Sequence, residues 1–294
     1  MNLLITGAWG VAREHIEEIE ALGHNVVFMQ WEKDELPCEY DWVEGVICNG
    51  LFLHHSISSF PNLKYIQLTS AGFDRVDMEE VARRKITVHN ARGVYSIPMA
   101  EYAVAGVLSL YKRLDEFRNQ QSRHEWKKIR EIRELSGKRV VIVGCGDVGV
   151  QCAKRFKAFD CEVVGVNRTV RKIEWFDRVE SLEKLDRELE TADVVIVTIT
   201  LTEATRGLIN AKMIRQDGVL VNISRGGTVD LTDAKCKMIL DVFENEPLDE
   251  NDPLWDEAMI TPHNSFVGEG NGFRLAALIK RNLISIAVPG EMRS

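Results

Sequence analysis

The sequence predicts an α/β protein with two doubly wound parallel sheets. Short apolar segments alternate with helical segments along the chain, which is the pattern of βαβ units. The strand segments in the second half are almost continuous valine and isoleucine, as expected for parallel strands buried on both faces. The 294 residues are 45% apolar, which suffices for two domains with separate cores, although one large domain also fits this length.

The first half of the chain carries the first series of these elements. Residues 12–23 have helical spacing, with isoleucine and leucine on one face and Gly23 as a stop signal. Five apolar segments predict strands: NLLITG (2–7), NVVFMQ (25–30), GVICNG (45–50), KYIQLTSAG (64–72) and ITVHN (86–90). This alternation predicts a parallel sheet with helices on both faces.

A long helix is predicted from about Pro98 to Gln121, between the two series of strands. Pro98 suits the first turn of a helix, and the apolar stripe of this helix is wide. One side of the stripe faces either a partner subunit or the interior of the same chain, and both interpretations remain open. The second series of strands is RVVIVG (139–144), CEVVGV (161–166), DVVIVTI (193–199) and GVLVNIS (218–224). Residues 272–288 predict one final amphipathic helix.

The charge and the cysteine content argue against several classes of function. The net charge is −8 and no stretch is a sustained basic run, so we expect neither nucleic acid nor a membrane as a partner. The six cysteines form no C-x-x-C pair, and no histidine cluster lies near them at zinc spacing, so no metal site is predicted. The chain start lacks a signal-peptide pattern, and no apolar run is long enough to span a bilayer. We therefore expect a cytoplasmic protein.

A glycine-rich loop follows the first strand of the second series. Gly144, Gly146 and Gly149 have the spacing G-x-G-x-x-G, between an apolar strand and a helix. The first glycine permits a tight turn, the second lets the backbone approach a pyrophosphate, and the third lets helix and strand pack closely. Because a helix N-terminus offers N–H groups to phosphates, we expect this loop, with Asp147 and Val148, to bind a dinucleotide.

The residues at the end of the next strand bear on the choice of dinucleotide. About 20 residues beyond the loop, an acidic residue would hold the ribose 2′-hydroxyl of NAD, but this chain has Asn167, Arg168 and Thr169 there. The absent carboxylate removes repulsion toward a 2′-phosphate, and Arg168 adds a positive charge. We therefore favour NADP over NAD. Alternatively, Arg168 stacks on adenine or points to solvent while Asn167 still contacts the ribose.

Three segments after the loop carry the candidate catalytic groups. Arg225 lies at the end of a buried strand, Asp241 and Glu246 lie in DVFENEP, and His263 follows a proline turn. An arginine at such a strand end can grip a carboxylate, and a histidine can exchange the proton that accompanies hydride transfer. A carboxylate on the far ring nitrogen would fix the histidine tautomer. Each residue alone is also compatible with a packing or surface role, but together, after a dinucleotide-binding pattern, they predict an oxidoreductase.

The chain resembles the D-isomer-specific 2-hydroxyacid dehydrogenases over nearly its whole length. The motifs that carry the resemblance occur in the order that this family uses: PNLKYIQLTSAGFDRVD (61–77), ITVHNARGVYSIPMAEYAV (86–104), ELSGKRVVIVGCGDVG (134–149), NISRGG (222–227), DVFENEPL (241–248) and TPHNS (261–265). The resemblance implies a Rossmann-type dinucleotide-binding domain over residues 96–265. It also implies a flavodoxin-like substrate domain over residues 1–95 and 266–294, and a homodimer.

The resemblance also implies the roles of the site residues. Arg225 would bind the substrate carboxylate and polarise its carbonyl group, His263 would be the acid/base, and Glu246 would orient it. Asp241 would hold the nicotinamide carboxamide. The remaining implied contacts are Ala71 and Gly72, whose backbone N–H groups would meet the substrate carboxylate. The implied reaction transfers a hydride between NAD(P)H and C2 of a small 2-keto acid, forming a 2-hydroxy acid.

Two departures from the family pattern stand out. The turn after the third strand of the second series has Thr200 where the family usually has proline, which would alter a ribose contact. The segment from Arg225 to Asp241 is shorter than the family's helix and turn. Either the helix is truncated or residues are missing from the sequence, and the break falls between Asp233 and Lys237.

Several alternatives and minor candidates stay open. A non-catalytic NAD(P)-sensing protein resembling the C-terminal-binding corepressors would keep the same residues. A phosphoglycerate-type dehydrogenase would need a basic phosphate pocket, for which Arg75 is the only obvious candidate. Four further residues have two interpretations each: His54 and His55 either line the substrate pocket or form a solvated turn, Trp126 either covers a partner's active site or packs locally, and Cys145 is either redox-active or a small apolar filler.

Overall fold

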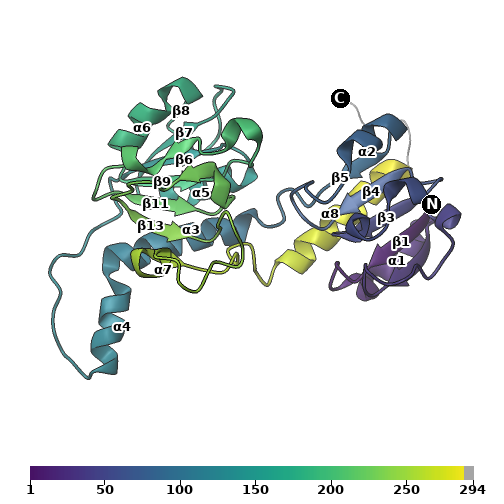
Figure 1. The fold of residues 1–294 in the computed structure, drawn as a ribbon, viewed down its shortest axis with the longest axis horizontal. Helices are drawn as coiled ribbons and strands as arrows, with labels where there is room; N and C mark the ends of the chain where they lie inside the picture. The colour runs from purple at the N-terminus through teal and green to yellow at the C-terminus, as the bar shows by residue number, and fades with distance from the viewer. Residues whose placement is uncertain (288–294) are drawn as a thin grey trace. The chain divides into compact units, whose positions relative to one another are not determined.

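The computed structural model describes residues 1–287, which form two compact units. The first unit contains residues 1–95 and the described part of the chain from Gly268 onward, and the second unit contains Ser96–Val267. Both are α/β structures with parallel sheets (Figure 1). The predicted fold class is therefore confirmed.

The first unit is built on a five-stranded sheet in the order β2-β1-β3-β4-β5, with every neighbouring pair parallel. Its strands are β1 (Asn2–Thr6), β2 (Asn25–Met29), β3 (Gly45–Cys48), β4 (Tyr65–Leu68) and β5 (Thr87–His89). This is the flavodoxin-like strand order, whose direction of winding reverses between β1 and β3. All five strands predicted for this half of the chain are present.

Helices cover both faces of the first sheet. The helices of this unit are α1 (Ile16–Ala21), α2 (Met78–Arg84) and α8 (Asn271–Ala287), with short 3₁₀ helices η1 (Ala12–His15), η2 (Tyr40–Trp42), η3 (Leu51–Leu53) and η4 (Ile57–Ser59). Leu3 and Ile5 of β1 face the core that contains α1 and α8, whereas Leu4 faces the core that contains α2. The final amphipathic helix is confirmed up to Ala287, and Val288 lies outside the described residues.

The second unit is built on seven parallel strands in the order β14-β13-β11-β9-β6-β7-β8. Its strands are β6 (Arg139–Val143), β7 (Glu162–Val166), β8 (Arg178–Glu180), β9 (Val194–Val197), β11 (Val219–Asn222), β13 (Lys237–Leu240) and β14 (Ala258–Ile260). The winding direction reverses between β6 and β9, as in Rossmann folds, so ligands are expected at the carboxyl ends of these two strands.

Two helical layers sandwich the second sheet. Its helices are α3 (Ser96–Lys112), α4 (Leu114–Ser122), α5 (Asp147–Lys157), α6 (Leu185–Thr191) and α7 (Leu254–Glu257), with 3₁₀ helices η5 (Leu182–Lys184), η6 (Glu203–Thr205), η7 (Ala211–Met213) and η8 (Gly226–Thr228). Val140 and Ile142 of β6 pack with α3 and α5, whereas Val141 and Val143 pack with α6. This burial on both faces explains the continuous valine and isoleucine of these strands.

The prediction of a single helix from Pro98 to Gln121 was wrong, because the structure has two helices there. Arg113 lies between α3 and α4 with φ +54, in the left-handed region, and a residue in that conformation ends a right-handed helix. The apolar stripe of α3 is buried in its own unit, where Ala103 and Val107 are completely covered. By contrast, α4 has no buried residue and projects from the second unit (Figure 1).

The connection between β11 and β13 is short and contains no α-helix. Residues 223–236 form only η8 and the two-residue strand β12 (Val229–Asp230), which pairs with β10 (Ile209–Asn210) in a separate small sheet. Asp233 has φ +56, in the left-handed region, and the chain turns there toward β13. The segment between Arg225 and Asp241 therefore has a 3₁₀ turn and a short strand where the resemblance implied a full helix.

Candidate active site

The glycine-rich loop lies at the switch point of the second sheet, between β6 and α5. Gly144 has φ +99, a conformation that L side chains rarely adopt. A Cβ at Gly149 would lie 2.1 Å from the carbonyl oxygen of Gly144, so only glycine lets α5 pack this closely on the strand. A Cβ at Gly146, in contrast, would meet nothing within 4 Å. The space beside Gly146 is open, which is what a bound pyrophosphate requires.

The first turn of α5 completes this cradle. Gly146 is the N-cap residue, and the first helical hydrogen bond runs from the Val150 N–H to the Gly146 carbonyl at 2.8 Å. The N–H groups of Asp147 and Val148 therefore precede the helix ladder, at the positive end of the helix dipole. Thr198, at the end of β9, donates its hydroxyl hydrogen to the Gly144 carbonyl at 2.7 Å and fixes the turn. These residues fit a dinucleotide.

The residues predicted to face the adenosine ribose lie at the end of β7 and after β9. Asn167 is half-buried, and its amide donates to the Thr169 carbonyl at 3.1 Å. Arg168 and Thr169 are exposed, and Arg168 has no ion-pair partner among residues 1–287. Thr200 is exposed in the loop after β9, and its carbonyl accepts the Thr205 hydroxyl at 2.7 Å.

Arg225 follows β11 at the N-cap position of η8. Its carbonyl accepts the Thr228 hydroxyl at 2.6 Å and the Asn222 amide at 3.1 Å, and its guanidinium donates to the Ser224 carbonyl at 2.8 Å. The next residue, Gly226, approaches the backbone of Phe243 so closely that a Cβ would lie 2.0 Å from the Phe243 carbonyl carbon. The Arg225 loop therefore lies beside the segment that carries Glu246.

His263 and Glu246 form a directly bonded pair. The Nδ1 atom of His263 is 2.7 Å from Oε2 of Glu246, and both side chains are partly exposed, at 37% and 36%. The other carboxylate oxygen of Glu246 accepts the Phe243 N–H at 3.0 Å, so the carboxylate is itself held in place. The ring of Phe266 meets the imidazole edge to face at a centroid distance of 5.9 Å. This arrangement leaves Nε2 as the imidazole nitrogen that can meet a substrate.

Asp241 is completely buried and organises the histidine segment. Its Oδ1 accepts the Thr261 hydroxyl at 2.5 Å and the Asn264 N–H at 2.7 Å, and its Oδ2 accepts the Ser265 N–H at 3.0 Å. Its backbone carbonyl accepts the His263 N–H at 2.8 Å. Sequence reasoning assigned Asp241 to the cofactor and missed this loop-holding function, because burial and hydrogen-bond direction cannot be deduced from DVF alone.

The predicted substrate loop belongs to the first unit. Ala71 and Gly72 follow β4, at the carboxyl edge of the first sheet. The Ala71 carbonyl accepts the Asn90 amide at 2.6 Å, and the Gly72 carbonyl accepts the Ser70 hydroxyl at 3.2 Å. The carbonyl groups of this loop are thus held within the first unit.

The four minor candidates have distinct surroundings. His55 is buried, with Nδ1 2.9 Å from the Tyr40 hydroxyl and Nε2 3.1 Å from the Glu32 carbonyl oxygen, and together with His54 it lines a surface pocket of the first unit. His54 is exposed. Trp126 is 99% exposed, which corrects the interpretation that it packs locally. Burial raises the pKa of the Cys145 thiol to about 12, as expected for an apolar filler rather than a redox group.

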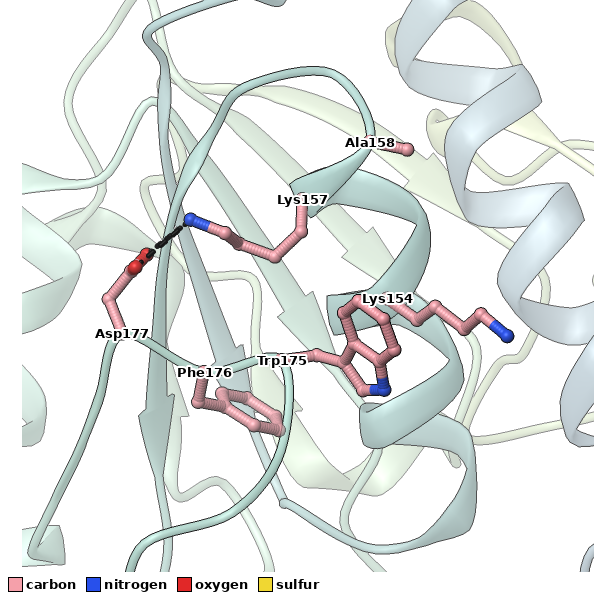
Figure 2. A pocket seen from close by; sticks show the side chains of 6 residues that line it. All are labelled: Lys154, Lys157, Ala158, Trp175, Phe176 and Asp177. Atoms are coloured by element: carbon pink, nitrogen blue, oxygen red, sulfur yellow. Dashed lines mark hydrogen bonds and ion pairs between the residues drawn. The ribbon is translucent and has the colours of Figure 1, made fainter.

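A separate pocket lies at the far end of α5 from the glycine loop. Lys154, Lys157 and Ala158 line it from the helix, and Trp175, Phe176 and Asp177 line it from the connection to β8 (Figure 2). Lys157 donates to the carboxylate of Asp177 at 2.9 Å, and the Lys154 ammonium lies 5.6 Å from the Trp175 ring centroid. None of the predicted site residues lines this pocket.

The described part of the chain has neither a metal-binding cluster nor a membrane-spanning helix. Within residues 1–287, no cluster of three or more histidine, cysteine, aspartate or glutamate side chains is arranged to hold a metal ion. No helix in these residues has the length and apolar character needed to cross a bilayer.

The fold and the site together define a class of protein. The second unit has a Rossmann sheet with a glycine loop at its switch point. An arginine and a hydrogen-bonded Glu–His pair follow this loop in the chain. These features are typical of a nicotinamide-dependent oxidoreductase that acts on an anionic substrate. Comparison with known proteins narrows this class. Residues 10–151 match the catalytic domain, and residues 104–265 the NAD binding domain, of the D-isomer specific 2-hydroxyacid dehydrogenase family. The chain belongs to this family.

Individual relatives agree with the family match. A glyoxylate reductase of Thermofilum pendens is 34% identical over 259 residues, which cover 79% of this chain and 74% of the relative. The crystal structure of a family protein from Aeromonas salmonicida has a TM-score of 0.85 at 27% identity, covering 97% of this chain and 94% of that one. A family protein from Xanthobacter autotrophicus, crystallised with NADPH and MES, has a TM-score of 0.76 at 25% identity, covering 98% and 96%. The protein is accordingly an NAD(P)-dependent 2-keto acid reductase, and the sensing and phosphoglycerate-type alternatives are not favoured.

Proposed function

We propose that the protein reduces glyoxylate or a similarly small 2-keto acid, with His263 as the acid/base, Glu246 as its orienting group and Arg225 as the substrate anchor. The 2.7 Å contact between His263 Nδ1 and Glu246 carries this proposal, because it occupies Nδ1 and leaves Nε2 for proton transfer to the substrate. The Thermofilum pendens relative, named a glyoxylate reductase, supports the substrate class.

The steps follow from the chemistry of these side chains. The Arg225 guanidinium, a planar fork of donors, grips the substrate carboxylate and polarises the neighbouring carbonyl group. The bound nicotinamide, when reduced, supplies the hydride that C2 receives. As negative charge develops on the carbonyl oxygen, protonated His263 donates its Nε2 proton to it, and the Glu246 carboxylate stabilises the imidazolium until then. The product is the 2-hydroxy acid.

The remaining predicted contacts are retained as proposals. The backbone of Ala71 and Gly72 would meet the substrate carboxylate, which makes the first unit (predicted as residues 1–95 and 266–294) the substrate domain. The second unit (predicted as 96–265) would bind the cofactor through its glycine loop, with Asn167, Thr169 and Thr200 near the ribose. Contact of Asp241 with the nicotinamide carboxamide stays a prediction.

We further propose NADP as the preferred cofactor, supported by the exposed Arg168 with its free guanidinium and by the lack of an acidic residue at the end of β7. Replacing Arg168 with alanine should weaken NADPH binding about ten-fold, the size of one charged hydrogen bond, and leave NADH binding within about two-fold. Arg171→Ala, an exposed arginine of the same loop, is the matched control. Equal losses for the two cofactors, measured by fluorescence titration, would contradict the preference.

A homodimer and a cytoplasmic location complete the proposal. Leu114 of α4 is 51% exposed and Trp126 is 99% exposed, so this projecting segment presents two large apolar side chains that a second copy would cover. All six cysteines are unpaired thiols, which fits a reducing compartment.

The experiment for the central proposal follows nicotinamide absorbance with NADPH or NADH and a panel of 2-keto acids from glyoxylate upward. His263→Asn is the informative variant, since His263 has φ +50 and asparagine tolerates the left-handed region. We expect kcat to fall by about 10²-fold or more with NADPH affinity retained, the usual effect of losing a general acid. The matched control is His124→Asn, an exposed histidine with φ +53. Full activity of His263→Asn would refute the mechanism.

A further inference from the structure

A hydrogen-bonded chain connects α3 to the histidine segment of the second unit. Tyr102 of α3 is half-buried, and its hydroxyl is 2.7 Å from Oγ1 of Thr261. Thr261 Oγ1 is in turn 2.5 Å from Oδ1 of the buried Asp241. Tyr102 and Thr261 are 159 residues apart in sequence, so the fold alone brings them together.

The direction of the hydrogen bonds follows from counting hydrogens. A threonine hydroxyl has one hydrogen and can donate only once. The Asp241 carboxylate accepts, because backbone N–H groups of Asn264 and Ser265 also point at it. Thr261 therefore donates to Asp241 and accepts from Tyr102. Burial raises the pKa of the Tyr102 phenol above its ordinary value, so the phenol keeps the hydrogen that it donates.

Asp241 transmits this chain to His263 through the backbone. The His263 N–H donates to the Asp241 carbonyl at 2.8 Å and to the Thr261 carbonyl at 3.0 Å, and His263 itself is left-handed, at φ +50. Such a conformation is unfavourable for a residue with a side chain, so it persists only where its surroundings fix it. Asp241 collects the N–H groups on the far side of His263, and Thr261 fixes the near side. Tyr102 sets the orientation of the Thr261 hydroxyl in this clamp.

We propose that Tyr102 is a positioning residue for His263 and acts through Thr261 and Asp241. The proposal rests on the proposed function, in which His263 transfers the proton. Tyr102 touches no reacting atom. Its phenol restricts the Thr261 hydroxyl, which holds one end of the left-handed turn at His263. Its loss should loosen the imidazole position, and a proton donor that is out of place by a fraction of an ångström slows the chemical step.

The first test compares Tyr102→Phe with Tyr111→Phe. Both tyrosines lie on α3, and the Tyr111 hydroxyl accepts from Arg133 at 3.1 Å, away from the histidine segment. We expect Tyr102→Phe to lower kcat by about 3- to 10-fold, the size of one neutral hydrogen bond. The KM for the keto acid and the NADPH dissociation constant should stay within about two-fold, because neither binding contact is lost. Tyr111→Phe should leave all three constants unchanged.

A double-mutant cycle tests the route through Thr261. Thr261→Val removes the hydroxyl at nearly constant shape and should lower kcat more than Tyr102→Phe does, because Asp241 also loses a donor. In the Thr261→Val background, Tyr102→Phe should have no further effect on kcat, as expected when two residues act as one unit. Thr261→Ser keeps the hydroxyl and should restore most of the rate.

The outcomes separate this inference from the proposed function. Additive losses in the cycle, or a Tyr102→Phe protein that matches Tyr111→Phe in kcat, would overturn the positioning role while His263→Asn still inactivates the enzyme. A Tyr102→Phe protein with a lower melting temperature and an unchanged kcat would likewise overturn the positioning role. An active His263→Asn protein would refute the proposed function itself. Three results together would establish Tyr102 as a positioning residue. Tyr102→Phe lowers kcat alone, it has no further effect on kcat in the Thr261→Val background, and Thr261→Ser keeps most of the rate that Thr261→Val loses.

Discussion

Gly149→Ala should lower the melting temperature, whereas Gly146→Ala should leave it unchanged or raise it slightly, although the two glycines are three residues apart in one loop. A Cβ at position 149 would lie 2.1 Å from the Gly144 carbonyl oxygen, which is backbone and cannot rotate away. The start of α5 must then move off β6. Overpacking of this kind costs about 1–3 kcal/mol. At about 2–4 °C per kcal/mol for a unit of this size, the melting temperature should fall by about 2–12 °C.

Position 146 offers no such obstacle, since a Cβ there meets nothing within 4 Å and the backbone, at φ −81, suits alanine. Gly→Ala at a compatible position restricts the unfolded chain and stabilises by about 0.4–1 kcal/mol. Gly146→Ala should therefore melt at or slightly above the wild-type temperature. The new methyl group occupies the open space that the pyrophosphate needs, so NADPH affinity should fall by about ten-fold or more.

Calorimetry of the apo proteins and fluorescence titration with NADPH separate the two effects. The reasoning predicts a stability defect for Gly149→Ala and a binding defect without a stability defect for Gly146→Ala. An unchanged melting temperature for Gly149→Ala would show that the helix is not held against the strand as described. Wild-type NADPH affinity in Gly146→Ala would show that the loop does not hold the phosphates.

Two further predictions concern charge. Glu246→Gln keeps the shape of the side chain but removes the charge beside His263. We expect kcat to fall about 10- to 100-fold, the size of a charge-assisted hydrogen bond, with NADPH affinity unchanged. A kcat equal to that of the wild type would argue against the role of the Glu246–His263 pair. Burial lowers the pKa of His24 and of His89 from 6.5, so the folded state favours their neutral forms while the unfolded chain takes up protons below about 6.5. The free energy of unfolding should therefore fall as pH drops through and below that value, measured by urea unfolding at several pH values. A double His24→Asn, His89→Asn variant should show a weaker dependence, and an identical pH profile would contradict this.

The elements with strong periodic patterns could be predicted from sequence, and those that depend on distant partners could not. The β6 strand, the glycine loop and α5 follow from local spacing, because the steric needs of a tight turn and a close helix contact act between neighbours in the chain. The left-handed break at Arg113 carries no such signal, because arginine favours helix, and the α4 helix beyond it has no buried residue. The periodic pattern alone therefore predicted one helix that continues past Arg113.

The candidate site divides in the same way. The motif around NEP and TPH indicated Glu246 and His263, and the structure brings them within 2.7 Å. Contact of Asp241 with the cofactor was predicted from the family resemblance alone. Its burial by Thr261, Asn264 and Ser265 depends on how residues 20 to 24 positions away fold back over it. Tyr102, 159 residues from Thr261, could have been found only through a three-dimensional contact.

The helix-free connection between β11 and β13 has a consequence for how the protein would lose activity on heating. Without a full helix, that edge of the sheet is covered by turns, and β14 beyond it is only partly buried, whereas β6 and β9 lie deep in the core. Segments with fewer buried contacts open in local fluctuations at lower free energy than the global transition. Asp241 follows β13 and His263 follows β14, so the histidine segment is attached to this partly buried edge of the sheet. Catalysis would then fail by fraying of this edge while the glycine cradle still held its dinucleotide.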